Sequence, residues 1–162
     1  MLATMDITTS NAKPDPAPPE VVVRGDARSF RQSVVAGRHH FVADEPVAYE
    51  GRDEGPGPYD YLLAALGVCT SMTIGLYARK KQFPLEDITV SLRHSRIHAK
   101  DCDDCETKEG MLDRIEVQVE MTGKLTPEQQ ARLMAVAAKC PVHRTLKSEI
   151  NIQLRGAPAT AP

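Results

Sequence analysis

Two cysteines, Cys69 and Cys140, are the residues whose types and settings most directly suggest chemistry. Cys69 lies in the small-residue, apolar segment LLAALGVCTSMTIGLYARK, and Cys140 lies in ARLMAVAAKCPVHRTLKS. Both segments have the pattern of core helices, and thiols that are far apart in sequence can meet when such helices pack together. In an intracellular protein, a thiol pair of this kind indicates redox chemistry more readily than a structural bridge.

The two thiols differ in how specific their settings are. A cysteine on an apolar helix face is usually a small core residue without chemistry, and this alternative applies above all to Cys69. Pro141 disfavours helical geometry at Cys140 and can open a new helical turn, which would place Cys140 at its N-cap. There the sulfur would face backbone N–H groups, with His143 and Arg144 adding positive charge. This local setting favours Cys140 as the more acidic thiol.

The helices that carry these thiols can be predicted from periodicity. The first starts near Tyr59 and ends in a basic run before Pro84. Its inner face is predicted to consist of Leu62, Leu66, Cys69, Thr73 and Leu76. The second starts at a capping box made by Thr126 and Gln129, with Pro127 at the first helical position, and ends at Cys140. Its inner face is predicted to hold Leu133, Val136, Ala137 and Cys140.

The remaining elements are predicted to be strands. Segments 20–25, 28–37 and 38–44 suggest an N-terminal meander, and a Gly- and Pro-rich connection without regular structure follows over 45–58. Segments 87–99 and 113–123 alternate apolar and polar residues and predict a long antiparallel hairpin. A last strand is expected over 149–154, sequence EINIQL. The order predicts one α+β domain over residues 20–155, with disordered tails at 1–19 and 156–162.

The segment GPGPYDYLLAALGVCTSMT, followed about 70 residues later by KCPVHRTL, resembles the OsmC/Ohr family of thiol peroxidases over residues 38 to 155. The resemblance implies an OsmC-like fold, in which two central helices pack against antiparallel sheets of an intertwined homodimer. It also implies active sites at the subunit interface, each with a cysteine pair that reduces organic hydroperoxides.

By position in the two motifs, the resemblance makes Cys69 the peroxide-attacking cysteine and Cys140 the resolving cysteine. An external dithiol or lipoyl-type reductant would restore the pair, and no bound cofactor is expected. The family's helix-start glutamate corresponds to Asp60, which is one methylene shorter; alternatively, Asp60 simply suits the helix dipole. The activating arginine is expected from the N-terminal sheet. Arg38 is preferred among four candidates, which are Arg24, Arg28, Arg31 and Arg38.

A second cluster has the types of residue that bind metals: His94, His98, Cys102 and Cys105. On a strand the two histidines stand about 13 Å apart, too far to share one zinc ion. His98 with the two cysteines and a further donor remains an alternative, as does a disulfide. A solvated hairpin loop is the favoured interpretation, because the carboxylates of DCDDCE disfavour thiolates. The loop resembles a subgroup of OsmC-like proteins.

The bulk composition is that of a soluble globular domain. The net charge of −2 gives no indication of a nucleic-acid or membrane surface. The N-terminus lacks the pattern of a signal peptide, and we expect no apolar run to approach the roughly 18 residues of a membrane helix. We therefore expect a cytoplasmic protein.

Three functions are consistent with these patterns. The first is a two-cysteine thiol peroxidase that acts on organic hydroperoxides. The second is a non-catalytic binding or stress-sensing protein that holds a small hydrophobic or electrophilic ligand at the dimer interface. The third is a metal-binding stress protein built around the CxxC loop.

Overall fold

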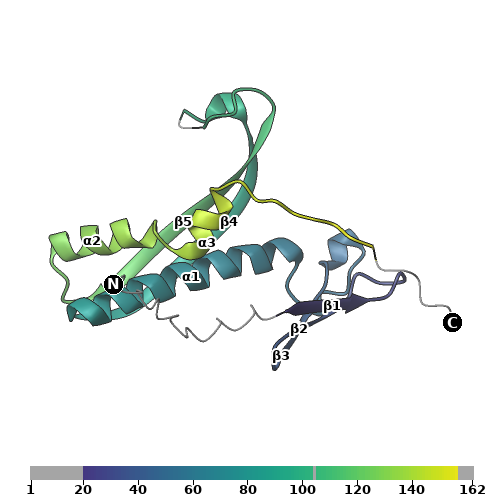
Figure 1. The fold of residues 1–162 in the computed structure, drawn as a ribbon, viewed down its shortest axis with the longest axis horizontal. Helices are drawn as coiled ribbons and strands as arrows, with labels where there is room; N and C mark the ends of the chain where they lie inside the picture. The colour runs from purple at the N-terminus through teal and green to yellow at the C-terminus, as the bar shows by residue number, and fades with distance from the viewer. Residues whose placement is uncertain (1–19, 104, 157–162) are drawn as a thin grey trace, which may run out of the picture. The chain divides into compact units, whose positions relative to one another are not determined.

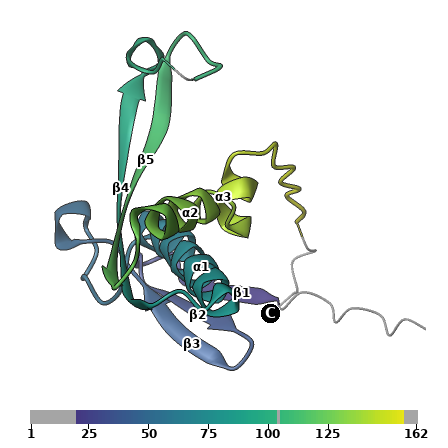
Figure 2. The same cartoon turned by 90° about the vertical axis from the view of Figure 1, so that its left-hand side faces the viewer.

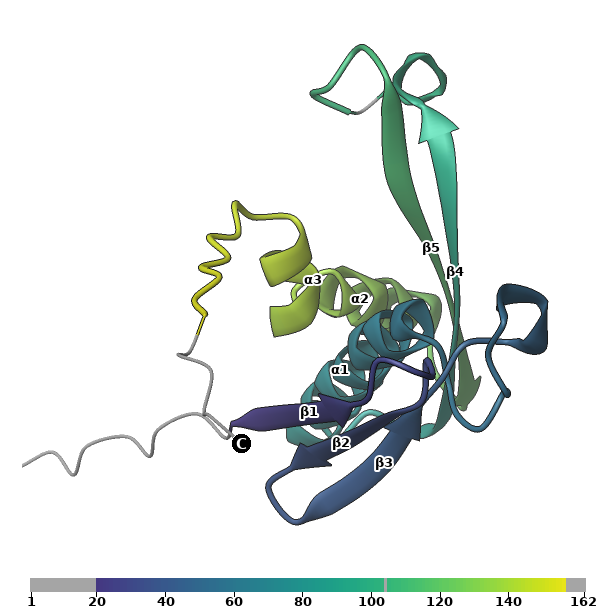
Figure 3. The same ribbon diagram turned by 90° about the vertical axis from the view of Figure 1, so that its right-hand side faces the viewer.

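The computed structural model describes residues 20–103 and 105–156, and the predicted tails lie outside these residues except for the exposed Gly156. Two compact units divide between Pro56 and Gly57. The first is the predicted antiparallel meander of β1 (Val21–Gly25), β2 (Gln32–Ala36) and β3 (His39–Ala43), which Figure 3 shows side by side. Gly37 has φ +59° at the β2–β3 turn, a left-handed conformation that suits glycine.

The segment after β3 is organised by one buried carboxylate. Asp44 is 2% exposed, and its Oδ1 accepts the Glu45 N–H at 2.9 Å. Its Oδ2 accepts the N–H groups of Arg52 at 3.1 Å and Glu54 at 3.3 Å. The prediction that 45–58 lacks regular structure is wrong for one turn, the 3₁₀ helix η1 (Val47–Tyr49), and Pro58 already belongs to the first long helix.

We expect Asp44→Ala to make the backbone from Glu45 to Glu54 more mobile, because its hydrogen bonds to Asp44 are lost. Burial raises the pKa of Asp44, but the three backbone hydrogen bonds lower it by more, so the net shift of the pKa is downward. The ionised Asp44 carboxylate therefore contributes to the stability of the fold above the ordinary aspartate pKa, and this contribution is lost as the pH falls through the lowered pKa. Hydrogen exchange should show faster exchange of the Arg52 and Glu54 amides, by about tenfold. Glu45→Ala, a control at the neighbouring carboxylate, should leave both amides unchanged.

The second unit is built on α1 (Pro58–Lys81), which starts with Pro58 at the first helical position. Its buried stripe is Leu66, Thr70, Ile74 and Ala78, spaced four residues apart, with Gly67 beside it. The predicted inner face is therefore partly wrong. It included Leu76, which is 48% exposed, and it missed Thr70 because the predicted face was drawn through Cys69 and Thr73 instead.

The other side of α1 is apolar and exposed. Val68, Met72 and Leu76 are all about half exposed or more, and Met72 reaches 68%. The expectation that no segment has the length and composition of a membrane helix is wrong for α1, where the mean hydropathy of the best 18-residue window is 1.6. One such helix is weak evidence for a membrane span, because helices of soluble proteins pass the same test.

The predicted hairpin is formed by β4 (Leu85–His98) and β5 (Met111–Gly123), which pair antiparallel almost throughout. Figures 1 and 2 show that one end of the hairpin lies by the helices and the other extends well beyond them. The 3₁₀ helix η2 (Ala99–Asp101) lies at the extended end. The side chains of Ile88, Val90 and Leu92 are half-buried and alternate with exposed neighbours, as predicted.

Two helices follow the hairpin. The predicted capping box opens α2 (Pro127–Ala137): Thr126 Oγ1 accepts the Gln129 N–H at 3.3 Å, and Gln129 Oε1 accepts the Thr126 N–H at 3.0 Å. The helix ends at Ala137, three residues before the predicted end at Cys140. A separate helix, α3 (Pro141–Leu146), then begins with Cys140 at its N-cap, as Pro141 indicated.

The core of this unit lies between α1 and α2. It joins Ile74 and Ala78 to Leu133 and Ala137, and half-buried side chains from the base of the hairpin pack around these four. The predicted last strand is wrong: residues 149–154 form no strand in the described part of the chain. Ile150, Ile152 and Leu154 are exposed there, because an alternating segment becomes a strand only when a sheet edge is available to pair with it.

Candidate functional site

The fold brings together the two thiols that the sequence singled out. Cys69 lies on α1, and Cys140 lies at the start of α3, which packs against α1. Thr70, the residue after Cys69, donates its hydroxyl to the sulfur of Cys140 at 3.6 Å, and neither Cys69 nor Cys140 is in a disulfide. Figure 2 shows the three helices gathered at this end of the second unit. The two free thiols are therefore neighbours that could be joined by a disulfide.

Cys140 is completely buried and surrounded by hydrogen-bond donors. Its sulfur accepts the His143 N–H at 3.2 Å and the Thr70 hydroxyl at 3.6 Å, a normal length for sulfur because of its larger radius. Burial raises the pKa of the Cys140 thiol. The hydrogen bonds from Thr70, His143, Cys69 and the Val142 N–H outweigh burial and bring the pKa below its ordinary value.

Cys69 is only half-buried, so it is the more accessible of the two sulfurs. Successive residues of a helix are about 100° apart, which puts Ala65, Met72 and Leu76 within about 60° of Cys69 around α1. All three are exposed. We call Ala65, Val68, Met72 and Leu76 the apolar strip. Cys69 therefore stands at the border between the packed face of α1 and the apolar strip.

The other two residues predicted for this site occupy different settings. Asp60 Oδ2 accepts the Gly57 N–H at 2.9 Å at the start of α1, which is the simple helix-capping alternative considered for it. Arg38 lies at the β2–β3 turn of the first unit, and Arg24 lies on β1 of the same unit. Arg28 forms an ion pair with Asp26, and Arg31 forms one with Glu54 at 2.7 Å. The activating role of Arg38 stays a prediction.

The candidate metal residues lie apart from the thiol pair, and their cysteines are bonded to each other. Cys102 and Cys105 form a disulfide at the extended end of the hairpin, which was a less favoured alternative to a loop with free thiols. Disulfide sulfurs are not thiolate ligands, so these two residues cannot hold zinc in this state. Within residues 20–103 and 105–156, no group of three or more His, Cys, Asp or Glu side chains could hold a metal ion.

The two histidines of that cluster lie on β4 and are not grouped with the cysteines. His94 Nε2 lies 2.9 Å from Asp113 Oδ1 across the hairpin, and its ring stacks on Tyr59 at 4.4 Å between centroids. His98 is exposed and pairs with Met111 in the register. His94 therefore has a structural role in packing the hairpin against the start of α1.

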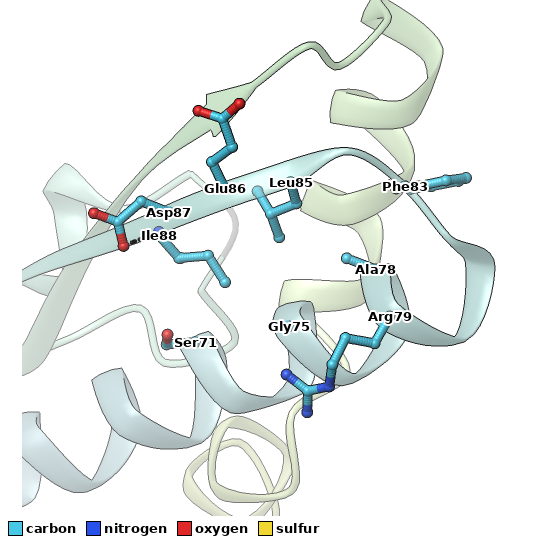
Figure 4. A pocket seen from close by; sticks show the side chains of 9 residues that line it. All are labelled: Ser71, Gly75, Ala78, Arg79, Phe83, Leu85, Glu86, Asp87 and Ile88. Carbon is cyan, nitrogen blue, oxygen red and sulfur yellow. Dashed lines mark hydrogen bonds between the residues drawn. The ribbon is translucent and has the colours of Figure 1, made fainter.

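A separate pocket of about 210 Å³ lies between α1 and the start of β4 (Figure 4). Ser71 and Arg79 from α1 face Leu85 and Ile88 from β4 across it, and Phe83 is also part of its lining. The carboxylate of Glu86 points away from the helix. Neither Cys69 nor Cys140 lines this pocket, and it contains no nucleophile of comparable reactivity, so we place the reactive site at the thiol pair.

The sequence interpretation missed one participant in this site, Thr70. Its hydroxyl is directed at the sulfur of Cys140, and the side chain is 3% exposed. Thr73, one turn later, donates instead to the Cys69 carbonyl at 2.7 Å, which is the common behaviour of threonine inside a helix. The four-residue spacing of Leu66, Thr70, Ile74 and Ala78 is the signal that would have placed Thr70 in the core.

Comparison with known proteins agrees with the predicted fold. The structure resembles an OsmC-like protein from Mycoplasma pneumoniae with a TM-score of 0.63 and 20% identity, covering 80% of this chain and 86% of that one. It also resembles an organic hydroperoxide resistance protein OsmC from Legionella pneumophila (TM-score 0.57, 18% identity, 80% and 88% covered). A third is an organic hydroperoxide resistance protein from Elizabethkingia anophelis (TM-score 0.59, 15% identity, 83% and 91% covered).

At these identities the likeness establishes an α+β fold of the OsmC type. None of the curated proteins matches the sequence significantly. The family model described as OsmC-like protein matches residues 51–155, which is well over half of the chain and includes both Cys69 and Cys140. The chain therefore belongs to the family of OsmC-like proteins.

Proposed function

We propose that this protein is a thiol peroxidase that reduces organic hydroperoxides through Cys69 and Cys140. The observation that carries the proposal is the meeting of the two free cysteines: Thr70, the residue after Cys69 on α1, donates its hydroxyl to the sulfur of Cys140 at 3.6 Å. Family membership supports it, because several structurally similar proteins are named for organic hydroperoxide resistance. The location expected from the sequence, the cytoplasm, is part of the same proposal, since thiols there are kept reduced.

The reaction has three stages. The Cys69 sulfur attacks the peroxide O–O bond and becomes a sulfenic acid, releasing an alcohol. Cys140 then displaces hydroxide from the Cys69 sulfur, forming a disulfide. An external dithiol, for which a lipoyl group is one candidate class, reduces that disulfide and restores both thiols.

The surroundings of Cys69 favour an organic peroxide over hydrogen peroxide. The apolar strip borders the partly exposed Cys69, so the hydrocarbon part of a substrate has an apolar surface to contact. Each buried methylene contributes about 0.8 kcal/mol. We therefore expect kcat/KM for cumene hydroperoxide to exceed that for hydrogen peroxide by at least about tenfold. Equal values for the two peroxides would contradict this assignment of the apolar strip.

We also propose that the protein is a homodimer in which a second copy covers part of the apolar strip. Three exposed apolar side chains on one helix face are unusual for a protein that works alone, and the apolar segment 149–154 is exposed as well. Light scattering should give the mass of two chains. Met72→Glu should shift the protein to one chain, because a buried carboxylate without a partner is costly. Gln118→Glu, at an exposed position of β5, is the matched control and should remain dimeric.

One observation favours a second candidate, a protein that binds an electrophilic or hydrophobic ligand without turnover. Asp60 is engaged in capping α1 through Gly57, whereas the peroxidase interpretation assigns it to an activating arginine. Steady-state assays with cumene hydroperoxide and a dithiol distinguish the two. Turnover by the wild-type protein supports the peroxidase. Absence of turnover, together with ligand binding that persists in Cys69→Ser and Cys140→Ser, supports the binding protein and contradicts our first proposal.

A further inference from the structure

The disulfide between Cys102 and Cys105 lies at the end of the hairpin that extends beyond the helices (Figure 1). The helices hold the other two cysteines, Cys69 and Cys140, in a separate place. Cys102 and Cys105 are both half-buried, and the described residues on either side of them are exposed. A thiol compound in solution therefore reaches this disulfide without any opening of the core.

The hairpin does not need this disulfide to close its extended end. β4 and β5 pair as far as His98 and Met111, and the Ala99 N–H then donates to the Gly110 carbonyl at 2.9 Å. Backbone hydrogen bonds thus already join the two strands where the disulfide segment begins. The bridge also spans a sequence separation of only three residues. Because a disulfide stabilises a fold least when it closes a short loop, a purely structural role explains little here.

The spacing of the two cysteines suits reversible opening and closing. Their α-carbons are 5.5 Å apart, and a Cys-x-x-Cys spacing is typical of dithiols that take part in redox exchange. Cys102 directly follows η2, and its N–H donates to the Ala99 carbonyl at 3.2 Å. Because the backbone holds Cys102 at the end of this turn, we expect the two sulfurs to stay within reach of each other after reduction.

Metal binding does not account for these cysteines. A structural zinc site needs four ligands, and His98 is the histidine nearest to Cys102 in the sequence. His98 is exposed at the end of β4, and in the part of the chain that the structure describes no three candidate ligands are grouped. Redox exchange needs only the two sulfurs, which are already bonded to each other.

From these observations we propose that Cys102 and Cys105 form a second redox site, at which the protein exchanges thiol and disulfide with dithiol compounds. The site works independently of Cys69 and Cys140, so this inference goes beyond the proposed peroxidase function and does not rest on it. A pair that cycles between dithiol and disulfide also agrees with the proposed cytoplasmic location, where lasting structural disulfides are rare.

The exchange balances in two steps. In the first, a thiolate of the external dithiol bonds to one hairpin sulfur, the bond between the Cys102 and Cys105 sulfurs breaks, and the other hairpin sulfur leaves as a thiolate. In the second, the remaining external thiol loses its proton, bonds to the external sulfur and displaces the first hairpin sulfur. One external dithiol and one hairpin disulfide give one external disulfide and two hairpin thiols, with two electrons and two protons transferred.

The short spacing of the cysteines favours dithiols over monothiols as partners. After the first step, the freed hairpin sulfur is three residues from the mixed disulfide, so it attacks and expels a monothiol before a second molecule arrives. A dithiol completes the second step within the same complex. We therefore expect dithiothreitol to reduce the site at a thiol concentration at least about a hundredfold lower than 2-mercaptoethanol requires. Equal concentrations would contradict the preference for dithiols.

Peptide mapping of the wild-type protein tests the redox site directly. Trypsin cuts after Lys100 and Lys108, so the peptide 101–108 contains both hairpin cysteines and neither Cys69 nor Cys140. In the folded protein, we expect dithiothreitol to convert this peptide to a form that is alkylated twice, and oxidised glutathione to restore its disulfide. A disulfide that is reduced only after denaturation, or thiols that stay free in oxidised glutathione, would overturn the proposal. This result is independent of whether the protein reduces peroxides.

Hydrogen exchange tests whether the hairpin stays in place when the site is reduced. The Ala99 amide, which donates across the hairpin to Gly110, should exchange within about twofold of its rate in the disulfide form. The Cys102 amide, whose acceptor lies in η2, should exchange at least about threefold faster, because the disulfide no longer restrains this turn. Faster exchange throughout β4 and β5 would show a structural bridge and contradict the proposal.

Independence from the other cysteine pair is tested by catalysis in Cys69→Ser, in which that pair is incomplete. We expect this variant to accelerate the oxidation of dithiothreitol by oxidised glutathione at least about tenfold over the reaction without protein. The matched control adds Cys102→Ser and Cys105→Ser to the same variant, and should give no acceleration. Equal rates with and without the hairpin cysteines would refute the second redox site.

Discussion

Replacing Cys69 with serine is expected to lower hydroperoxide turnover by at least about a thousandfold, because the sulfur forms the covalent intermediate and an alcohol cannot replace it. Cys140→Ser should also abolish steady-state turnover, since the sulfenic acid then has no partner thiol. Neither change introduces a larger side chain into the core. Both losses should therefore appear in folded protein, as checked by circular dichroism.

The control for these variants is the double replacement Cys102→Ser/Cys105→Ser. It removes a disulfide at the extended end of the hairpin, away from the helices that hold the reactive pair, and should keep turnover within about twofold of wild type. Turnover that persists in Cys69→Ser, or that requires the hairpin disulfide, would place the chemistry at a different site from the one described above.

Leu133→Ala is expected to have the largest effect on stability, lowering the free energy of unfolding by about 3 kcal/mol. Leu133 has no exposed surface and lies in the core with Ile74 and Ala137, where α2 packs on α1. Because α2 leads directly to Cys140, loss of the Leu133 side chain should also disturb the position of Cys140 relative to Cys69. Denaturant unfolding measures the first effect. The rate at which a thiol reagent alkylates Cys69 and Cys140 in the folded protein measures the second.

Met134→Ala provides the comparison, because Met134 is the next residue of α2 but is 43% exposed. Its replacement should cost less than about 1 kcal/mol. Similar losses in the two variants would show that the contact between α1 and α2 does not form the core of this unit.

The parts of the fold that depend on local rules were predictable from the sequence. The meander, the long hairpin and the capping box of Thr126 follow from alternation and from side-chain hydrogen bonds within a few residues. The placement of Cys140 at the start of a helix followed from Pro141 alone. In these cases the information lies within one element, so tertiary packing has little to add.

The features that were mispredicted depend on what an element packs against. The buried stripe of α1 runs through Thr70, and spacing alone does not show that its hydroxyl contacts the sulfur of Cys140 on another helix. Residues 149–154 alternate apolar and polar side chains as a half-buried strand does. In the described part of the chain this segment pairs with no sheet edge, so it forms no strand. An aspartate such as Asp60 in a first helical turn can either cap the helix or hold an arginine. Its hydrogen bond from the Gly57 N–H shows the capping role and does not test the other.

The central claim is that peroxide oxidation joins Cys69 to Cys140. Reduced protein is treated with one equivalent of cumene hydroperoxide, free thiols are alkylated, and the digest is mapped by mass spectrometry. We predict a linked pair of peptides carrying Cys69 and Cys140, which disappears on reduction by a dithiol. Recovery of both cysteines in alkylated form, or of Cys69 oxidised to a sulfinic acid while Cys140 remains a free thiol, would contradict the account.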